Sequence, residues 1–340
     1  MKKTALIVLL FVLSATAAHQ MRIHLSDESD AVFRVSRIDS ITFEEIVAGA
    51  HADVMACWAN SDSIFVADST GGNARVIPLP FGTVREPDVA RLAIGPQNSE
   101  YCFYLEWRNS GEQDTLYIVD DLSGANLRKI PQAYQATIRD ISYTPSGDMV
   151  LVYYNGTSES PVYRLTAGES ELTEVYDLGD ELSNVHDIDF DSEGRMYALE
   201  GGSRLYRFAS EEGGSVEELV ADSLVSDPDD PEFTEMNSID IDRATGIIYM
   251  DANYSTMYAD HDDHYWIEIP AFSGVGASFT GGFNLNSGGG EFLQVIPGTA
   301  YFVYDDNLGA VYMYSDFTDP DSGTTLVDRP NIHDIAVRDQ

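Results

Sequence analysis

Apolar and polar residues alternate in short stretches along most of the chain, and these stretches recur as a repeated unit. Val185–Phe190 has a period near two, because Asp187 and Asp189 interrupt its apolar residues. A glycine turn at Gly194 and a second apolar stretch, Met196–Leu199, follow it. The pattern predicts strand, turn and strand, and no stretch has the sustained 3.6-residue period of a helix. Similar units are centred on Gly147 and Gly246.

A self-similar unit made only of strands predicts an all-β fold, and specifically a β-propeller of four-stranded blades. The second strand of each unit, such as Ile64–Ala67 or Tyr301–Tyr304, is apolar on both faces. A strand between two neighbouring sheets needs this, because both of its faces leave water. Candidates for the innermost strands recur about every 40–50 residues. They align at Val54, Arg91, Asp140, Asp187, Ser238, Gln294 and Asp334.

The two ends of the chain suggest how the ring closes. Asn331–Val337 has the pattern of an inner strand, and three strands without an inner strand are expected at Met21–Leu25, Val32–Val35 and Ile41–Glu45. Pairing the N- and C-terminal strands closes a ring of seven blades and removes two exposed edges. In the alternative with six blades, residues 18–48 are an appended hairpin. Residues 49–340 form the propeller in either case.

The first 17 residues have the features of a signal peptide. Lys2 and Lys3 precede the apolar run Ala5–Leu13, and Ala15–Ala17 supplies small residues for cleavage. The apolar run is too short to span a bilayer, so no membrane insertion is expected. No cysteine stands directly after the cleavage site, and the mature protein is expected to be secreted or periplasmic. Cys57 and Cys102, the two cysteines, are either a disulfide or two buried thiols.

The charge balance restricts the partners. Lys and Arg number 19 against 57 Asp and Glu, a formal net charge of −38. Such a surface repels phosphate backbones and anionic lipid, so nucleic acid and membrane partners are not expected. Either the acidic residues form a solvated coat suited to high salt, or the surface binds calcium, and the sequence leaves both open.

Residues Ile64–Leu79 resemble the NHL-type repeat. They contain an aromatic-Val-Ala-Asp strand at Phe65–Asp68, a turn with Asn73, and Arg75-Val76 on the next strand. Looser copies are found at Met196–Phe208 and Tyr301–Tyr314. The chain thus resembles the NHL-like and TolB-like β-propeller repeat proteins of exported bacterial type. The resemblance implies six blades and a binding platform, although some relatives are enzymes.

Polar residues recur where inner strands would enter the central channel. Asn184–Asp187 and Asn331–Asp334 share an Asn-x-His-Asp pattern. Around one axis such groups could bind a ligand, share a cation or act as an acid/base pair. Alternatively, each Asp accepts backbone N–H groups of the adjacent blade and each His is a hydrogen-bonded filler. The candidate ligand-binding residues are Arg139, Asp140, His186, Asp187, Asn237, His333 and Asp334.

A second candidate site is the densest cluster of metal-ligand residue types, predicted to lie in a loop. It could hold zinc or calcium, or be a solvated loop. The channel entries also resemble those of gluconolactonase-type propellers, where acidic and Asn side chains hold a catalytic calcium ion, but no complete ligand set matches here. The second candidate site, the loop cluster of metal-ligand residue types, consists of Asp260, His261, Asp262, Asp263 and His264.

These features favour an exported, non-catalytic propeller. It is expected to be a monomer that binds an extracellular ligand or protein at its channel face, either alone or with the assistance of calcium. The alternative is a metal-dependent, lactonase-like propeller hydrolase that uses His186, Asp187, Asn237, His333 and Asp334.

Overall fold

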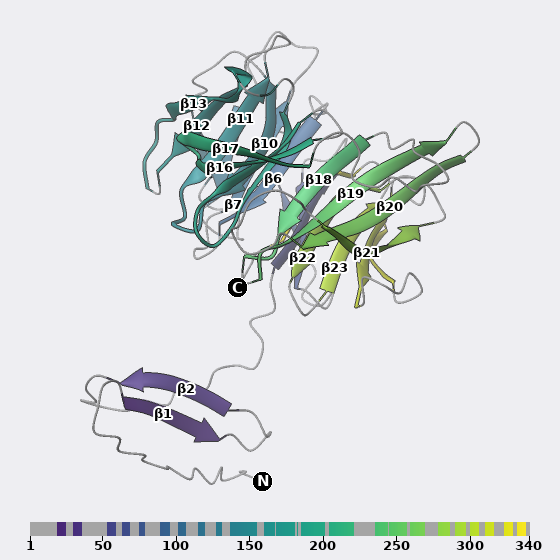
Figure 1. Ribbon diagram of the computed structural model, residues 1–340, viewed down its shortest axis with the longest axis horizontal. Helices are drawn as coiled ribbons and strands as arrows, with labels where there is room; N and C mark the ends of the chain where they lie inside the picture. The colour runs from purple at the N-terminus through teal and green to yellow at the C-terminus, as the bar shows by residue number, and fades with distance from the viewer. Residues whose placement is uncertain are drawn as a thin grey trace. The chain divides into compact units, whose positions relative to one another are not determined.

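A computed structural model of the chain consists almost entirely of antiparallel β-strands (Figure 1). Its contacts divide the chain into two units, Met1–Ala50 and His51–Gln340. None of the described residues form a helix that is long and apolar enough to cross a membrane. The structure describes residues 19–24, 30–35, 53–58, 63–68, 75–78, 89–95, 101–106, 115–119, 127–130, 137–154, 160–166, 168–180, 182, 185–200, 204–220, 235–243, 245–256, 259–268, 278–285, 290–296, 300–305, 310–315, 323–328 and 332–337.

The first unit contains a two-stranded antiparallel sheet of β1 (His19–His24) and β2 (Asp30–Val35). The favoured seven-blade arrangement pairs N-terminal strands with the C-terminal strand. In the structure β1 and β2 pair with each other, and the C-terminal strand β26 (Ile332–Val337) pairs with β3 (Asp53–Trp58) instead. The third expected strand, 41–45, lies outside the described residues.

Within its described residues, the second unit contains six four-stranded antiparallel sheets. One sheet joins β26 to three strands from the start of the unit, β3, β4 (Ser63–Asp68) and β5 (Arg75–Pro78). The other five sheets each use four consecutive strands, so chain order and sheet order agree. The first two of these contain β6 (Val89–Ile94), β7 (Tyr101–Glu106), β8 (Thr115–Val119) and β9 (Leu127–Ile130), and then β10 (Thr137–Tyr143), β11 (Met149–Tyr154), β12 (Pro161–Leu165) and β13 (Thr173–Asp177).

A short 3-10 helix, Leu178–Asp180, leads from the second of these sheets to the third. The third sheet contains β14 (Val185–Phe190), β15 (Met196–Glu200), β16 (Arg204–Ser210) and β17 (Gly213–Val220). The fourth contains β18 (Glu235–Ile241), β19 (Ile247–Thr256), β20 (Ala259–Glu268) and β21 (Ser278–Leu285). The fifth contains β22 (Gly290–Ile296), β23 (Ala300–Asp305), β24 (Ala310–Tyr314) and β25 (Thr324–Asp328).

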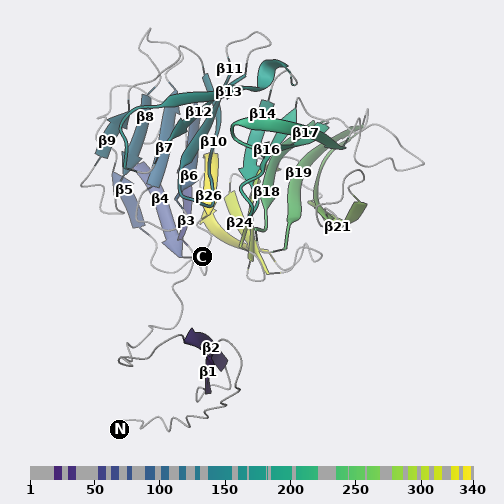
Figure 2. The same ribbon diagram turned by 60° about the vertical axis from the view of Figure 1, so that its left-hand side comes forward.

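The first strands of the six sheets lie next to one another. In order, β26 neighbours β6, β6 neighbours β10, and the series continues through β14, β18 and β22 back to β26. Figure 2 shows the C-terminal strand β26, in yellow, near β6 and β3. Side chains from all six first strands can therefore meet in one central space.

The core lies between neighbouring sheets, and β11 shows how one strand serves two interfaces. Leu151 and Tyr153 pack with residues of the preceding sheet, such as Ile118. Val150 and Val152, on the opposite face, belong to the cluster of the following sheet. All four of these side chains are fully buried, as the two-sided apolar pattern of the second strands predicts.

Glycine turns join the first strand to the second in three sheets, as the repeat predicts. Gly147, Gly194 and Gly246 have φ angles of 91°, 78° and 75°. This left-handed conformation costs little only for glycine. In the turn of the β14 sheet, the N–H of Gly194 donates to the carbonyl of Asp191 at 3.0 Å. The recurring glycine is thus explained by backbone geometry.

Candidate functional site

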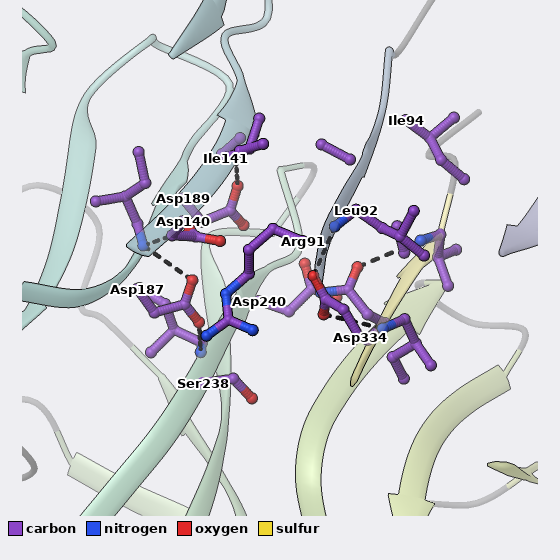
Figure 3. A pocket seen from close by; sticks show the side chains of 18 of the residues that line it. Arg91, Leu92, Ile94, Asp140, Ile141, Asp187, Asp189, Ser238, Asp240 and Asp334 are labelled. Atoms are coloured by element: carbon purple, nitrogen blue, oxygen red, sulfur yellow. Dashed lines mark hydrogen bonds between the residues drawn. The ribbon is translucent and has the colours of Figure 1, made fainter. Parts of the chain in front are cut away.

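The first strands surround a cavity of about 110 Å³ (Figure 3). Its lining includes residues of β6, β10, β14, β18, β22 and β26, because all six strands meet there. Carboxyl groups outnumber guanidinium groups in this lining. The acidic, basic and histidine residues of the lining are Asp140, Asp187, Asp189, Asp240, Asp334, Arg91, Arg243 and His186.

Three of these carboxylates each connect one first strand to the next one. Asp334 Oδ2 on β26 accepts the N–H of Leu92 on β6 at 2.7 Å. Asp140 on β10 accepts the N–H of Ile188 on β14 at 2.9 Å. Asp187 on β14 in turn accepts the N–H of Ile239 on β18 at 2.6 Å. Each carboxylate therefore satisfies a backbone donor of the neighbouring sheet, which is the structural alternative that the sequence left open.

The same role extends around the cavity with other acceptor groups. Ser238 Oγ accepts the N–H of Leu293 at 3.2 Å, which joins β18 to β22. Gln294 Oε1 accepts the N–H of Val337 at 3.4 Å, which joins β22 to β26. A second row two residues further on contains Asp189, which accepts from Ile241 at 2.8 Å, and Asp240, which accepts from Val295.

The junction between β6 and β10 differs from the others. Arg91 occupies the position that Asp holds in three other strands, and its Nε donates to the carbonyl oxygen of Arg139 at 2.7 Å. The direction of the hydrogen bond is thus reversed at this junction, because a side chain donates to the next strand. The side chain of Arg91 extends among the acidic groups of the cavity (Figure 3).

Burial changes the acidity of three of the carboxyl groups. It raises the pKa of Asp187 well above its usual range, and the neighbouring Asp140 raises it further. It raises the pKa of Asp334 to about 7, although Arg91 acts in the opposite direction. Burial also raises the pKa of Asp189, against the opposing effect of Arg243. At these three positions burial therefore favours the protonated carboxyl group.

Arg243 joins three sheets at one end of the cavity. Its Nη2 donates to the carbonyl of Tyr143 at the end of β10, at 2.7 Å. Its Nε donates to the carbonyl of Phe190 at the end of β14, at 3.1 Å. Arg243 itself follows β18. A planar guanidinium can make both bonds at once because its donors point in different directions.

A β-bulge recurs near the start of the first strands. The register shifts by one residue in β10, β14, β18, β22 and β26, but not in β6. Such a bulge leaves one residue unpaired and redirects its side chain. The extra residues are Arg139, His186, Asn237, Glu291 and His333.

Four of these bulge residues belong to the candidate binding set. The backbone places these four at equivalent positions of their strands, because each one is the extra residue of a bulge. Arg139 lies with its Cζ 4.5 Å from the centre of the Tyr154 ring, a cation–π contact. His186 lines the cavity. The side chains of Asn237 and His333 lie outside the described part of the structure. Glu291 was missed because the sequence alignment chose Gln294, three residues further along.

The second candidate cluster is not in a loop. Residues 260–264 belong to β20, where they pair with β19, and Asp262 lies opposite Asn253. Their side chains, and those of Cys57 and Cys102, lie outside the described residues.

In the part of the chain that the structure describes, no three His, Cys, Asp or Glu side chains are arranged to hold a metal ion. For Asp140, Asp187 and Asp334, the hydrogen bonds to neighbouring strands account for at least one oxygen each. The arrangement joins neighbouring sheets and places carboxyl groups of raised pKa in a polar cavity.

No family profile and no curated protein matches the chain. Among solved structures, TolB from Acinetobacter baumannii aligns over 98% of this chain and 82% of that chain, with a TM-score of 0.55 and 9% sequence identity. YCF48 bound to D1 peptide aligns over 84% of this chain and 82% of that chain (TM-score 0.44, 10% identity). Virginiamycin B lyase from Staphylococcus aureus aligns over 70% of each (TM-score 0.45, 11% identity). All three are β-propeller proteins. The similarity to TolB supports the β-propeller fold and, at this identity, the fold alone.

Proposed function

We propose that this chain is a non-catalytic binding protein that holds a ligand or a protein partner at one face of a β-propeller. The observation that carries the proposal is the β-bulge in five of the six first strands. Bulges are enriched beside functional sites, where they redirect a side chain. Here they place chemically different residues, Arg139, His186, Asn237, Glu291 and His333, at equivalent positions of the first strands, and His186 lines the cavity.

The propeller itself is proposed to have six blades. The six four-stranded sheets and the pairing of β26 with β3 support this number. In this arrangement the last strand of the chain completes the first blade, so no sheet edge is left open at the junction. The NHL-like character of the repeats belongs to the same proposal and has its support in residues 64–79.

Binding is favoured over catalysis because of how the acidic groups are used. Asp140, Asp187 and Asp334 each accept a backbone N–H of the next strand. A carboxylate in such a bond is held in place and helps to join two sheets, so any movement during a reaction would weaken that junction. A fixed polar lining suits the recognition of a ligand better than it suits a catalytic base.

The ligand is proposed to carry positive charge. Five carboxyl groups and two guanidinium groups line the cavity, and a bound cation would itself favour the ionised form of the carboxyl groups whose pKa burial raises. The whole chain has a formal net charge of −38. Complementary charge accelerates association and selects the partner. A lysine or arginine side chain of a peptide segment, presented to the cavity, has the required charge and size.

Export of the protein is part of the proposal. The basic and apolar residues within the first 17 positions support a cleavable signal peptide. N-terminal sequencing of the protein secreted by a bacterial host tests this point. A start near residue 18 is expected, and an intact Met1 in the secreted fraction would contradict it.

Calorimetric titration with two peptides of equal length, one rich in lysine and arginine and one rich in glutamate, tests the binding role. We expect the basic peptide to bind, more weakly at high salt, and the acidic peptide not to bind. Two variants then separate the cavity from the general acidic surface, since each removes one negative charge. Asp240→Asn changes the cavity lining, and Glu171→Gln changes an exposed residue.

A binding site in the cavity predicts a loss of affinity of about tenfold for Asp240→Asn and little change for Glu171→Gln, since one close charge pair contributes about 1.5 kcal/mol or more. Equal effects of the two variants would mean that the peptide binds the acidic surface without a site. Absence of binding by both peptides would refute the positively charged ligand.

A further inference from the structure

Two carboxylates of the cavity converge on a single backbone donor. Asp140 Oδ2 lies 2.9 Å from the nitrogen of Ile188, and Asp187 Oδ1 lies 2.9 Å from the same nitrogen. Figure 3 shows the two side chains close together at the junction of β10 and β14. The N–H group is a neutral donor shared by both carboxylates, so it does not cancel the repulsion between two negative charges. A proton between the carboxyl groups would remove this repulsion.

The surroundings of the pair favour such a proton. Asp187 is removed from water, and Asp140 is close enough to form a side-chain hydrogen bond with it. Two like charges at short distance disfavour ionisation of both groups. The other oxygen of Asp187 already accepts the N–H of Ile239 on β18. The remaining titratable and charged residues of the cavity lining are Arg91 from β6, Tyr143 from β10, His186 at the bulge of β14, Asp189 from β14, Asp240 from β18, Asp334 from β26 and Arg243 after β18, and Arg139 precedes Asp140 at the bulge of β10.

We propose that Asp140 and Asp187 form a carboxyl pair that shares one proton, so that the junction of the β10, β14 and β18 sheets is linked to pH. With the proton in place, the Asp187 hydroxyl donates to Asp140, and the Oδ atoms continue to accept from Ile188 and Ile239. When the proton leaves, two negative charges face each other across β10 and β14. The packing of these three sheets then becomes weaker.

The sign of the effect follows from linkage. The pKa of Asp187 is higher in the folded protein than in the unfolded chain, so the folded state binds the proton more tightly. The contribution to stability is complete below the unfolded pKa of about 4 and is lost as the pH rises through the folded pKa. In this interval the unfolding constant rises about tenfold per pH unit for each proton released.

The experiment compares chemical denaturation of the wild-type protein, Asp187→Asn and Asp140→Asn at half-unit steps from pH 5 to pH 9. An amide at position 187 resembles the protonated carboxyl group, since it can donate to Asp140 and still accept from Ile239. We expect the slope of the logarithm of the unfolding constant against pH to fall by about one in the Asp187→Asn variant. This fall applies to the interval between the pKa of Asp187 in the unfolded chain and its pKa in the folded protein.

Asp140→Asn tests whether the proton belongs to the pair. Removal of the like charge favours ionisation of Asp187, so the slope should fall in this variant as well. An unchanged slope in Asp187→Asn would overturn the proposal, because Asp187 would then be ionised throughout. A fall in Asp187→Asn without a fall in Asp140→Asn would also overturn it, because burial alone would then hold the proton.

Ser238→Ala is the matched control. Ser238 lies on β18 and its hydroxyl accepts the N–H of Leu293 of the next sheet at 3.2 Å, but the hydroxyl does not titrate in this range. The variant is expected to lose stability without a change in slope, and a change in slope of the same size as in Asp187→Asn would contradict the assignment to the pair.

Hydrogen exchange in the wild-type protein provides a test that does not depend on folded variants. The amides of Ile239 and Leu293 both donate between sheets, but Leu293 donates to the hydroxyl of Ser238. The ratio of the protection of Ile239 to that of Leu293 is expected to fall by about tenfold as the proton is released. A ratio that stays constant from pH 5 to pH 9 would refute the proton-linked junction.

Discussion

The backbone N–H of Ile239 lies 2.6 Å from Oδ2 of Asp187, so a side chain of β14 completes the hydrogen bonding of β18. The same relation connects Asp140 to Ile188 and Asp334 to Leu92. Neighbouring sheets in this protein are therefore joined in two ways, by apolar packing between their faces and by directed hydrogen bonds between their first strands. The second kind depends on a few residues, which makes it accessible to mutation.

Asp189→Ala is expected to destabilise the protein by about 3 kcal/mol. Asp189 accepts the backbone N–H groups of Ile241 and Phe190 and the hydroxyl of Ser142. The substitution leaves these buried donors without their acceptor, at a cost of about 1–3 kcal/mol for an unsatisfied group. Asp189→Asn keeps an acceptor oxygen and is expected to lose less than about 1 kcal/mol. Urea denaturation of both variants measures the difference, and equal losses would show that these hydrogen bonds contribute little.

Arg243→Ala is expected to cost about 2 kcal/mol, since hydrogen bonds to a charged group contribute about 1.5–3 kcal/mol. The guanidinium donates to the carbonyl groups of Tyr143 and Phe190 from two different nitrogens. Arg243→Lys keeps the charge but has a single nitrogen, so its loss should be intermediate. Full stability of the lysine variant in a thermal melt would mean that charge, and not the bridge between three sheets, is what matters.

The two glycines Gly194 and Gly213 allow strain to be separated from steric overlap. Both have positive φ, 78° and 82°. A Cβ at Gly194 would meet nothing within 4 Å, whereas at Gly213 it would lie 2.6 Å from Cε2 of Tyr176. We expect a loss of about 1 kcal/mol for Gly194→Ala, from backbone strain alone.

For Gly213→Ala the overlap adds to the strain, and the loss should be about 3 kcal/mol. Equilibrium denaturation measures both. Equal losses would mean that Tyr176 moves aside at little cost. The aromatic contact of Tyr176 with Phe208, with ring centres 6.1 Å apart, is expected to oppose this movement.

Asp334 provides a second pH dependence. Its pKa is about 7 in the folded protein, because burial outweighs the effect of Arg91. The folded state holds this proton more tightly than the unfolded chain, so stability should decrease as the pH rises from about 4 to about 7. Asp334→Asn should remove this part of the decrease.

Arg91→Gln should move the pKa of Asp334 higher, because it removes the opposing positive charge. The titration of Asp334 by carbon-detected NMR measures the shift directly. A lower pKa in this variant would show that Arg91 does not face Asp334 in solution. Asp140 also raises the pKa of Asp334, so Asp140→Asn should lower the pKa of Asp334 as well.

Local patterns in the sequence were sufficient to predict many of the strands and turns, although residues 260–264, expected in a loop, belong to β20. The alternation in Val185–Phe190 corresponds to β14, and the glycines at 147, 194 and 246 lie in turns with positive φ. Strand period and turn geometry depend on neighbouring residues, so one sequence can reveal them. The expectation that carboxylates of the first strands contact the adjacent sheet follows from the same repeat, and the hydrogen bonds of Asp140, Asp187 and Asp334 agree with it.

The sheet partners at the chain ends could not be predicted in this way. Val337 pairs with Val54, residues at opposite ends of the second unit, and Val54 therefore lies in the second strand of its sheet and not in a first strand. The alternating patterns of β1 and of β3 are both compatible with pairing to β26. Only contacts between distant segments distinguish them, and such contacts leave no periodic mark on the sequence.

By itself, then, the sequence determined that this protein is made of repeated strands with glycine turns, a strongly acidic surface and polar residues at the start of its first strands. Only the tertiary structure decided that β26 completes the sheet of β3, that single-residue bulges redirect the residues before the aspartates, and that Asp140 and Asp187 converge on one N–H. The physical reason is that alternation and turns are local properties, whereas register, closure and the meeting of charges depend on how segments far apart in the chain pack against each other.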